Sequence, residues 1–496
     1  MNYKELVETC ENEIRAGQMV RARRRLAHEV SLKDVPRDWA LPVAHVARRT
    51  GLIGFAMKLL APIVRPKKNL AKTATSKERA EYGVLLHRGG AALESLEILE
   101  TVNLEEAPEA LLYRVYCLFN QWDHLAAVPL LQDYLAREKN PYQAMVGELN
   151  LCSALVSARR FDEALDTLNR YSARAKEQNL MRLLGNSLEL RAQVHLHRGD
   201  YSSARRDLQE ASSVLSDGKV FDSILVRKWS LITEALEQRS LEPLEKLRLE
   251  ALSAFAWETV REVDRFKLKI DFRQDAFNHL YFGTPYAMYR KLISEEFKVM
   301  PVVRDYTWGG SGNSILDLST GRIEGSHAEA SAMPRKRHLL ISILAKDFYQ
   351  GVRIGGIFSQ LFPGEYFDIF SSPQRVRQQI YRTRLWYEEN GIPFQIKERQ
   401  GFYSLAIQND FGIRVTAVDA QADGWRRDWN RLLNELKGES TFGAAFVSER
   451  LDVSRSGVKR LLLWALEQGL IVKEGKAANT TYRLSKGPRP AHARVA

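Results

Sequence analysis

The stretches RRFDEALDTLNRY, residues 159–171, and RGDYSSARRDLQEA, residues 198–211, decide the fold of the first half of the chain. Each places an aromatic residue, then an alanine three positions on, then a leucine four positions further, as in Phe161, Ala164 and Leu168. On a helix these positions share one face, where the alanine lets a second helix approach and the bulky residues fill the groove beside it. The pattern predicts pairs of packed helices.

Weaker copies of this pattern recur through the first 240 residues, which are almost entirely helix formers. The copies begin at Met19, Ile53, Ala92, Trp122, Phe161 and Tyr201, with the copy at Trp122 fitting least well. Their spacing of 30 to 40 residues is typical of stacked helical hairpins. The two clear copies resemble tetratricopeptide repeats, which implies a solenoid over residues 1–245 that binds a protein partner or self-associates, for example as a homodimer. An ordinary helical bundle is the alternative.

Residues 246–305 also predict helices, but their apolar pattern no longer repeats, so we expect a capping and connecting segment. Thr284 followed by Pro285 predicts a helix start, with Thr as the N-cap and Pro at the first helical position. The aromatic side chains of this segment are expected to pack the end of the solenoid rather than bind a ligand. They are Phe272, Phe277, Tyr281, Phe282, Tyr286 and Tyr289.

The composition changes near Tyr306. TWGGSGNS, residues 307–314, predicts a flexible linker, and SILDLSTGRIEG, residues 314–325, alternates like a β-hairpin with a Thr-Gly turn. Helices are then expected over 335–350, 354–362 and 371–391, followed by a β-ribbon over 392–407. This order is that of a helix-turn-helix with a wing.

The third of these helices carries the candidate DNA-binding side chains. Its buried stripe is predicted at Val376, Ile380, Thr383 and Tyr387. Ser371 and Ser372, before Pro373, are expected to supply the N-cap. The opposite face and its flanks hold side chains of the kinds that pair with base edges and phosphates in the major groove. They are Gln374, Arg375, Arg377, Gln378, Tyr381, Arg382 and Arg384, and Leu385 is expected on the same face.

The run VRQQIYRTRLWYEENGIPFQIKERQGFYSL, residues 376–405, resembles the winged-helix domain of OmpR/PhoB-type bacterial response regulators, and the resemblance covers residues 306–408. It implies that Arg377, Gln378, Tyr381, Arg382 and Arg384 lie on a recognition helix and that Arg399 lies near the wing. Two features depart from the family. Thr383 replaces a core leucine, and Gln400-Gly401-Phe402 shortens the wing motif, which puts wing contacts in doubt.

Charge agrees with this interpretation. Residues 335–407 hold eleven Lys and Arg against six Asp and Glu, net +5, and the whole chain of 496 residues carries +12. A basic excess favours nucleic acid as a partner. The alternative is a surface helix that is basic merely for solubility.

Residues 411–487 predict a second helix-turn-helix with a wing, and the pattern L-x-V-S-x-x-x-V-x-x-x-L within them resembles that of a generic bacterial winged helix. Its third helix would bury Val458, Leu461, Leu462 and Ala465, with Ser454 as N-cap and Gly469 just past its end. The candidate DNA contacts are Arg455, Ser456, Lys459 and Arg460, with Lys473, Lys476 and Asn479 on the wing. Residues 452–486 are net +4, but Leu463 and Trp464 on the outer side suit a protein interface, so protein docking stays open. Residues 488–496 form a basic tail.

Nothing in the sequence supports catalysis, a cofactor or a metal site. Cys10, Cys117 and Cys152 are far apart, and His195 and His197 would point apart on a helix. Walker, H-E-x-x-H and G-x-S-x-G motifs do not occur, so a nuclease or other enzyme has no support. The N-terminus lacks the pattern of a secretory signal, and the sequence offers no membrane span.

The sequence therefore predicts a mainly α chain, with a tetratricopeptide-like solenoid followed by two winged helix-turn-helix domains over 306–410 and 411–487. We expect a cytoplasmic, bacterial-type transcriptional regulator that binds double-stranded DNA and is nucleoid-associated when bound. The alternative is a scaffold, not an enzyme, whose repeats and winged helices dock proteins.

Overall fold

The computed structural model describes residues 2–66, 73–215, 220–301, 303, 305–310, 313–327, 333–407, 411–416, 424–436, 440–451, 455–475 and 480–485. The chain is mainly α-helical and forms two compact units. Unit 1 comprises Met1–Pro301, Asp347–Arg377 and Gln400–Phe402, and unit 2 comprises Val302–Lys346, Gln378–Arg399 and Tyr403–Ala496. The division into domains drawn from the sequence stays a prediction.

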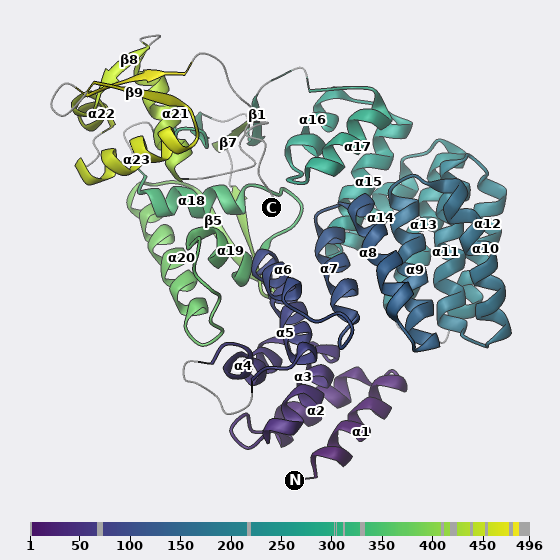
Figure 1. Cartoon of the computed structure of the whole chain (residues 1–496). Helices are drawn as coiled ribbons and strands as arrows, with labels where there is room; N and C mark the ends of the chain where they lie inside the picture. The colour runs from purple at the N-terminus through teal and green to yellow at the C-terminus, as the bar shows by residue number, and fades with distance from the viewer. Residues whose placement is uncertain are drawn as a thin grey trace. The chain divides into compact units, whose positions relative to one another are not determined.

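Unit 1 is a helical repeat in which consecutive helices pack as hairpins, and Figure 1 shows α9 to α13 lying side by side. The α-helices of its first segment, up to Pro301, are α1 (Tyr3–Arg15), α2 (Met19–Glu29), α3 (Ala40–Arg49), α4 (Ile53–Val64), α5 (Ser76–Gly89), α6 (Ala92–Glu100), α7 (Glu109–Asn120), α8 (His124–Arg137), α9 (Pro141–Ser157), α10 (Phe161–Glu177), α11 (Met181–His197), α12 (Tyr201–Leu215), α13 (Val220–Gln238), α14 (Glu242–Ser253), α15 (Trp257–Ile270), α16 (Gln274–Phe282) and α17 (Ala287–Phe297). A short 3-10 helix, η1 (Arg37–Trp39), precedes α3.

The repeat pattern is confirmed in its geometry. Five of the six copies begin at the first residue of the second helix of a hairpin, namely α2, α4, α6, α10 and α12. The small residue of each of these copies is completely buried: Ala22, Ala56, Ser95, Ala164 and Ala204. A methyl or hydroxymethyl group at that place lets the two helices of a hairpin approach closely.

The copy predicted at Trp122 is wrong by two residues. Helix α8 begins at His124, because Asp123 caps it by accepting a hydrogen bond from the Ala126 N–H at 3.2 Å. Trp122 instead has φ of 59° and packs edge-on against the Tyr289 ring, with ring centroids 4.5 Å apart. The pattern is restored from His124, since Ala127 and Leu131 are both completely buried.

Helices α15 to α17 close unit 1 with an aromatic core. Phe277, Phe282 and Tyr289 are buried as predicted, whereas Phe272 is 44% exposed. The helix start predicted at Thr284-Pro285 is also wrong, because α17 begins at Ala287. In the turn before it, the Gly283 carbonyl accepts from the Phe348 N–H at 3.0 Å and the Thr284 carbonyl from the Arg290 guanidinium at 2.6 Å. Both acceptors would be directed differently in a helix.

The remaining elements follow residue 304. They are β1 (Asp305–Gly309), β2 (Ser314–Asp317), β3 (Arg322–Gly325), α18 (Arg335–Leu344), β4 (Val352–Arg353), α19 (Ile354–Leu361), α20 (Ser372–Glu389), β5 (Phe394–Arg399), β6 (Phe402–Ile407), β7 (Phe411–Thr416), α21 (Gly424–Leu436), β8 (Thr441–Gly443), α22 (Ala444–Leu451), α23 (Arg455–Glu467), β9 (Ile471–Glu474) and β10 (Thr481–Leu484). The helices predicted over 354–362 and 371–391 and the ribbon over 392–407 are thus present.

Three small sheets accompany these helices. The first has strand order β1-β7-β2-β3, in which β2 and β7 run parallel, with Leu316 opposite Ile413, and the other pairs are antiparallel. It contains the hairpin predicted over 314–325, which turns at Gly321 with φ of 70°. The other sheets have the orders β4-β6-β5 and β8-β10-β9. The expected linker over 307–314 lies partly in β1 and β2 and partly outside the described residues.

Candidate functional site

Helix α20 has the two faces that the sequence predicts. Val376, Ile380, Thr383 and Tyr387 are all buried, at most 2% exposed, and form the stripe that holds the helix in place. Thr383, where the OmpR/PhoB pattern has leucine, satisfies its buried hydroxyl within the helix by donating to the Gln379 carbonyl at 2.8 Å. A polar residue is therefore accommodated in this core position without an unpaired group.

The opposite face of α20 is a polar surface open to solvent. Gln374, Arg377, Gln378, Tyr381 and Arg382 are exposed, Tyr381 by 61%. Within the part of the chain that the structure describes, none of these five side chains has a hydrogen bond or an ion pair. We call these five residues the α20 face. Side chains that are displayed without an internal partner are available to an external one.

Two of the predicted DNA-contact residues also make contacts within the fold, and their role in DNA binding stays a prediction. Arg375 is half-buried, stacks on the Phe362 ring at 4.0 Å and pairs with Glu365. The Arg384 guanidinium donates to the Ile396 carbonyl of β5 at 2.6 Å. These contacts position α20 against the loop before it and the strand after it, so neither arginine joins the α20 face.

The start of α20 and the predicted wing differ in detail from expectation. Ser372 is the first helical residue and not the N-cap, and its hydroxyl accepts from the Asp368 N–H at 2.9 Å. The wing is a tight turn between β5 and β6, in which Gln400 and Gly401 both have positive φ, 53° and 79°. Two such residues in succession make the type I′ turn that suits a two-residue hairpin. Arg399 lies exposed at the end of β5, beside this turn.

The C-terminal module, which comprises the elements from α21 to β10, also buries the stripe predicted on its last helix, α23. Val458, Leu461, Leu462 and Ala465 of α23 are at most 3% exposed, and Gly469 has the φ of 66° expected just past a helix end. Lys459 and Arg460 are exposed on the outer side. Of the other residues predicted here, the side chains of Arg455 and Ser456 and the whole of Ser454, Lys476 and Asn479 lie outside the described residues.

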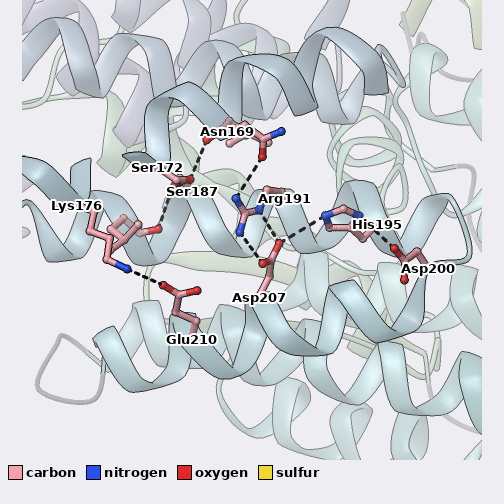
Figure 2. A network of polar contacts seen from close by, with 11 residues as sticks. Asn169, Ser172, Lys176, Ser187, Arg191, His195, Asp200, Asp207 and Glu210 are labelled. Carbon is pink, nitrogen blue, oxygen red and sulfur yellow. Dashed lines mark hydrogen bonds and ion pairs between the residues drawn. The ribbon is translucent and has the colours of Figure 1, made fainter. Parts of the chain in front are cut away.

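A polar network, which the sequence did not reveal, joins the two clearest repeats (Figure 2). Arg191 of α11 holds the buried Asp207 of α12 through two hydrogen bonds of 2.7 Å and reaches the Asn169 side chain of α10 at 3.2 Å. His195 lies 3.7 Å from the same carboxylate, between Asp207 and Asp200. The network ties three successive helices together, and the only sequence signal for it was an aspartate placed directly before the buried Leu208.

A second group of charges is buried among α15, α17 and the segment after α18. Arg261 is completely buried and pairs with Asp347 at 2.5 Å. Burial alone would raise the pKa of Glu296, but Arg265 and Lys269, each 2.6 Å away, outweigh burial and lower that pKa to about 2. Opposite charges at this distance favour the ionised carboxylate. These ion pairs hold together the last helices of the repeat and the segment that begins at Asp347. Each buried charge has an opposite partner, which indicates that the group stabilises the fold and does not take part in a reaction.

The described residues offer no sign of a metal centre or of a membrane-spanning helix. Among the described residues, no three His, Cys, Asp or Glu side chains are placed to hold a metal ion. Cys10, Cys117 and Cys152 are buried and free. His197, far from pairing with His195, stacks on the Phe161 ring at 5.1 Å. Within the described ranges, no helix has the length and apolar character needed to cross a membrane.

Comparison with protein-family models gave no match, and neither did comparison with curated proteins. Solved structures similar to the chain include MamA MSR-1 C2, with 20% identity and a TM-score of 0.28, covering 36% of this chain and 95% of MamA. A Rap protein complexed with competence and sporulation factor has 11% identity and a TM-score of 0.39, covering 60% of this chain and 92% of its own. A tetratricopeptide repeat protein from Parabacteroides merdae has 16% identity and a TM-score of 0.31, covering 59% and 98%. All three TM-scores are below 0.5, so the helical repeat is established here by the hairpins themselves.

Proposed function

We propose that this chain is a non-enzymatic scaffold whose helical-repeat unit docks a protein partner. The observation that carries the proposal is an apolar edge, formed by Val20, Leu93 and Leu125, which are 63%, 63% and 55% exposed. Each is the second residue of the second helix of a hairpin, in α2, α6 and α8. Because all the second helices of a stack start at the same edge of the solenoid, these side chains line one edge.

An exposed leucine by itself is ordinary, but recurrence at one repeat position supports a surface kept for binding. The equivalent residues of the three other hairpins that carry the repeat pattern from their first residue, Gly54, Asp162 and Ser202, are small or polar. The apolar edge is therefore confined to the first part of the repeat unit.

Photo-crosslinking tests this proposal. A photoreactive amino acid replaces Leu93 or Leu125 in the full chain, inside the cells that produce it, and Asp162 serves as the matched control because it holds the same place in α10. We expect a discrete protein adduct, with another protein or a second copy, from positions 93 and 125 and not from 162. Equal or absent adducts at all three positions contradict the proposal.

A second candidate function is binding of double-stranded DNA, and the α20 face favours it. Arginine and glutamine have the fork geometry that recognises guanine and adenine edges, and further arginines contact phosphates. The order of α18, α19, α20 and the β5–β6 hairpin, after a small sheet, is consistent with the OmpR/PhoB-type winged helix that the sequence resembles. In this account the repeats bring a partner to DNA, as in a cytoplasmic transcriptional regulator.

Selection from a random pool of duplexes, at two salt concentrations, tests this second function. A motif that survives the higher salt would establish sequence-specific binding, and its length would show whether the C-terminal module also reads bases. Enrichment without a motif that is lost in salt would mean contact with phosphates only. If no duplex binds at either concentration, the scaffold function is the one that remains, and both helix-turn-helix modules would then dock proteins.

A further inference from the structure

A pocket of about 710 Å³ lies in the C-terminal module, between residues of its last two helices and of its three-stranded sheet. Its walls come from α22, α23 and the strands β9 and β10. That volume falls within the range of small-molecule sites, roughly 300 to 1,000 Å³. Ala444 and Ala445, at the start of α22, line it with short side chains and thereby leave the space open.

The walls of the pocket are largely apolar. Val458, Leu462, Leu463 and Leu466 of α23 line one side, and the Tyr482 ring, which stacks on Phe442 behind it, lines another. Leu463 is 48% exposed. A ligand with an apolar body would cover this side chain.

Two lysines give the pocket its charge. Lys459 and Lys473 both line it and are exposed, and neither has an ion pair within the described residues. Glu449 is the one acidic residue among the lining residues, so the lining is net positive. An ammonium beside an apolar wall favours a ligand that is apolar over most of its length and anionic at one end.

We propose that this pocket binds an amphipathic carboxylic acid, with its apolar body against Leu462, Leu463 and Tyr482 and its carboxylate held by Lys459 and Lys473. The proposal is independent of the function assigned to the repeats and to α20. It gives Lys459 a role other than the DNA contact expected from the sequence, and it makes the C-terminal module the place where a small molecule acts on the protein.

Fluorescence titration of the full chain with 11-(dansylamino)undecanoate tests the proposal, because dansyl emission rises when the group enters an apolar site. We expect one saturable site, displacement by unlabelled dodecanoate, and weaker binding of the methyl ester of the same dye. Lys459→Glu and Lys473→Glu should each raise the Kd roughly tenfold or more, since each replaces an attraction by a repulsion. Arg460→Glu, on the same helix but outside the lining, should change it by less than about twofold.

Each other outcome overturns the proposal. An absence of saturable binding does so, as does equal affinity for acid and ester, or an unchanged Kd in both lysine variants with thermal unfolding like that of the parent. If the dye fails but a helical peptide with leucine and glutamate on one face binds and is lost in Lys459→Glu, the pocket is a protein-docking groove. DNA binding by Arg382→Ala is measured separately, so failure here does not bear on α20.

Discussion

The Arg261 guanidinium donates to the Asp347 carboxylate at 2.5 Å, although 86 residues separate the two in the sequence. Arg261 is completely buried and lies over the rings of Tyr286 and Tyr349, 5.1 Å and 5.2 Å from their centroids. The pair fastens the segment that begins at Asp347 to helix α15 of the repeat unit. A buried arginine is tolerated here because carboxylates and aromatic faces replace its water.

Removal of one residue of this pair should therefore lower the free energy of unfolding. We expect Arg261→Met to destabilise the repeat unit by about 3–5 kcal/mol, because Asp347 is left as a buried charge without its main partner. The double variant Arg261→Met, Asp347→Asn should recover part of this loss. Urea unfolding gives the free energies, and amide hydrogen exchange should show faster exchange over residues 347–361 in the single variant. A double variant that is no more stable than Arg261→Met would mean that the two residues are not coupled.

The small position of the repeat supplies a second prediction. Ala204 is completely buried at the α12 contact, so Ala204→Leu should overpack it and cost about 1–3 kcal/mol of unfolding free energy. Ser202→Leu, at an exposed position of the same helix, is the control and should change stability by less than about 0.5 kcal/mol. Thermal unfolding followed by circular dichroism compares the two. Equal stability of both variants would show that the closest approach of the helices lies elsewhere.

Acid should weaken the repeat unit through Glu296. Its pKa in the folded protein, about 2, is below the usual 4.5, so the ionised carboxylate stabilises the fold above pH 4.5 and this stabilisation is lost as pH falls toward 2. The shift corresponds to roughly 3 kcal/mol. We expect Glu296→Gln to be less stable than the parent at neutral pH, with a gap that closes between pH 4.5 and 2. Glu295→Gln, exposed on the same helix, should show no such gap.

Two arginines of the α20 face are expected to contribute differently to DNA binding. If α20 binds duplex DNA, Arg382→Ala should relax sequence preference by about 1–3 kcal/mol per contacted base. Arg377→Ala should weaken all duplexes alike and lower the salt dependence by about one phosphate contact. Selection and salt titration separate these effects. Unchanged binding in both variants would remove α20 from the interface.

The sequence predicted correctly those features that follow a regular spacing of residues. The small residues of the repeat recur once in each copy, and the buried stripes of α20 and α23 recur every three or four positions. The structure buries both sets as predicted. Sequence reasoning failed where a distant group competes with the local preference. Trp122 lies before helix α8 and packs against Tyr289. Arg375 packs on Phe362 and pairs with Glu365, contacts that the helical period does not show, and its role in DNA binding stays a prediction. The Arg261 and Asp347 pair leaves no local trace, because no spacing relates residues that the fold brings together.

The affinity of the full chain for the protein captured at Leu93 tests the scaffold most directly. It is measured with the parent chain, with Leu93→Glu and Leu125→Glu, and with Asp162→Asn as the matched control at the same repeat position. We predict that each leucine variant raises the Kd about tenfold or more while the control leaves it unchanged, because a charge placed on the apolar edge must be desolvated on docking. An unchanged Kd in both leucine variants would contradict the account.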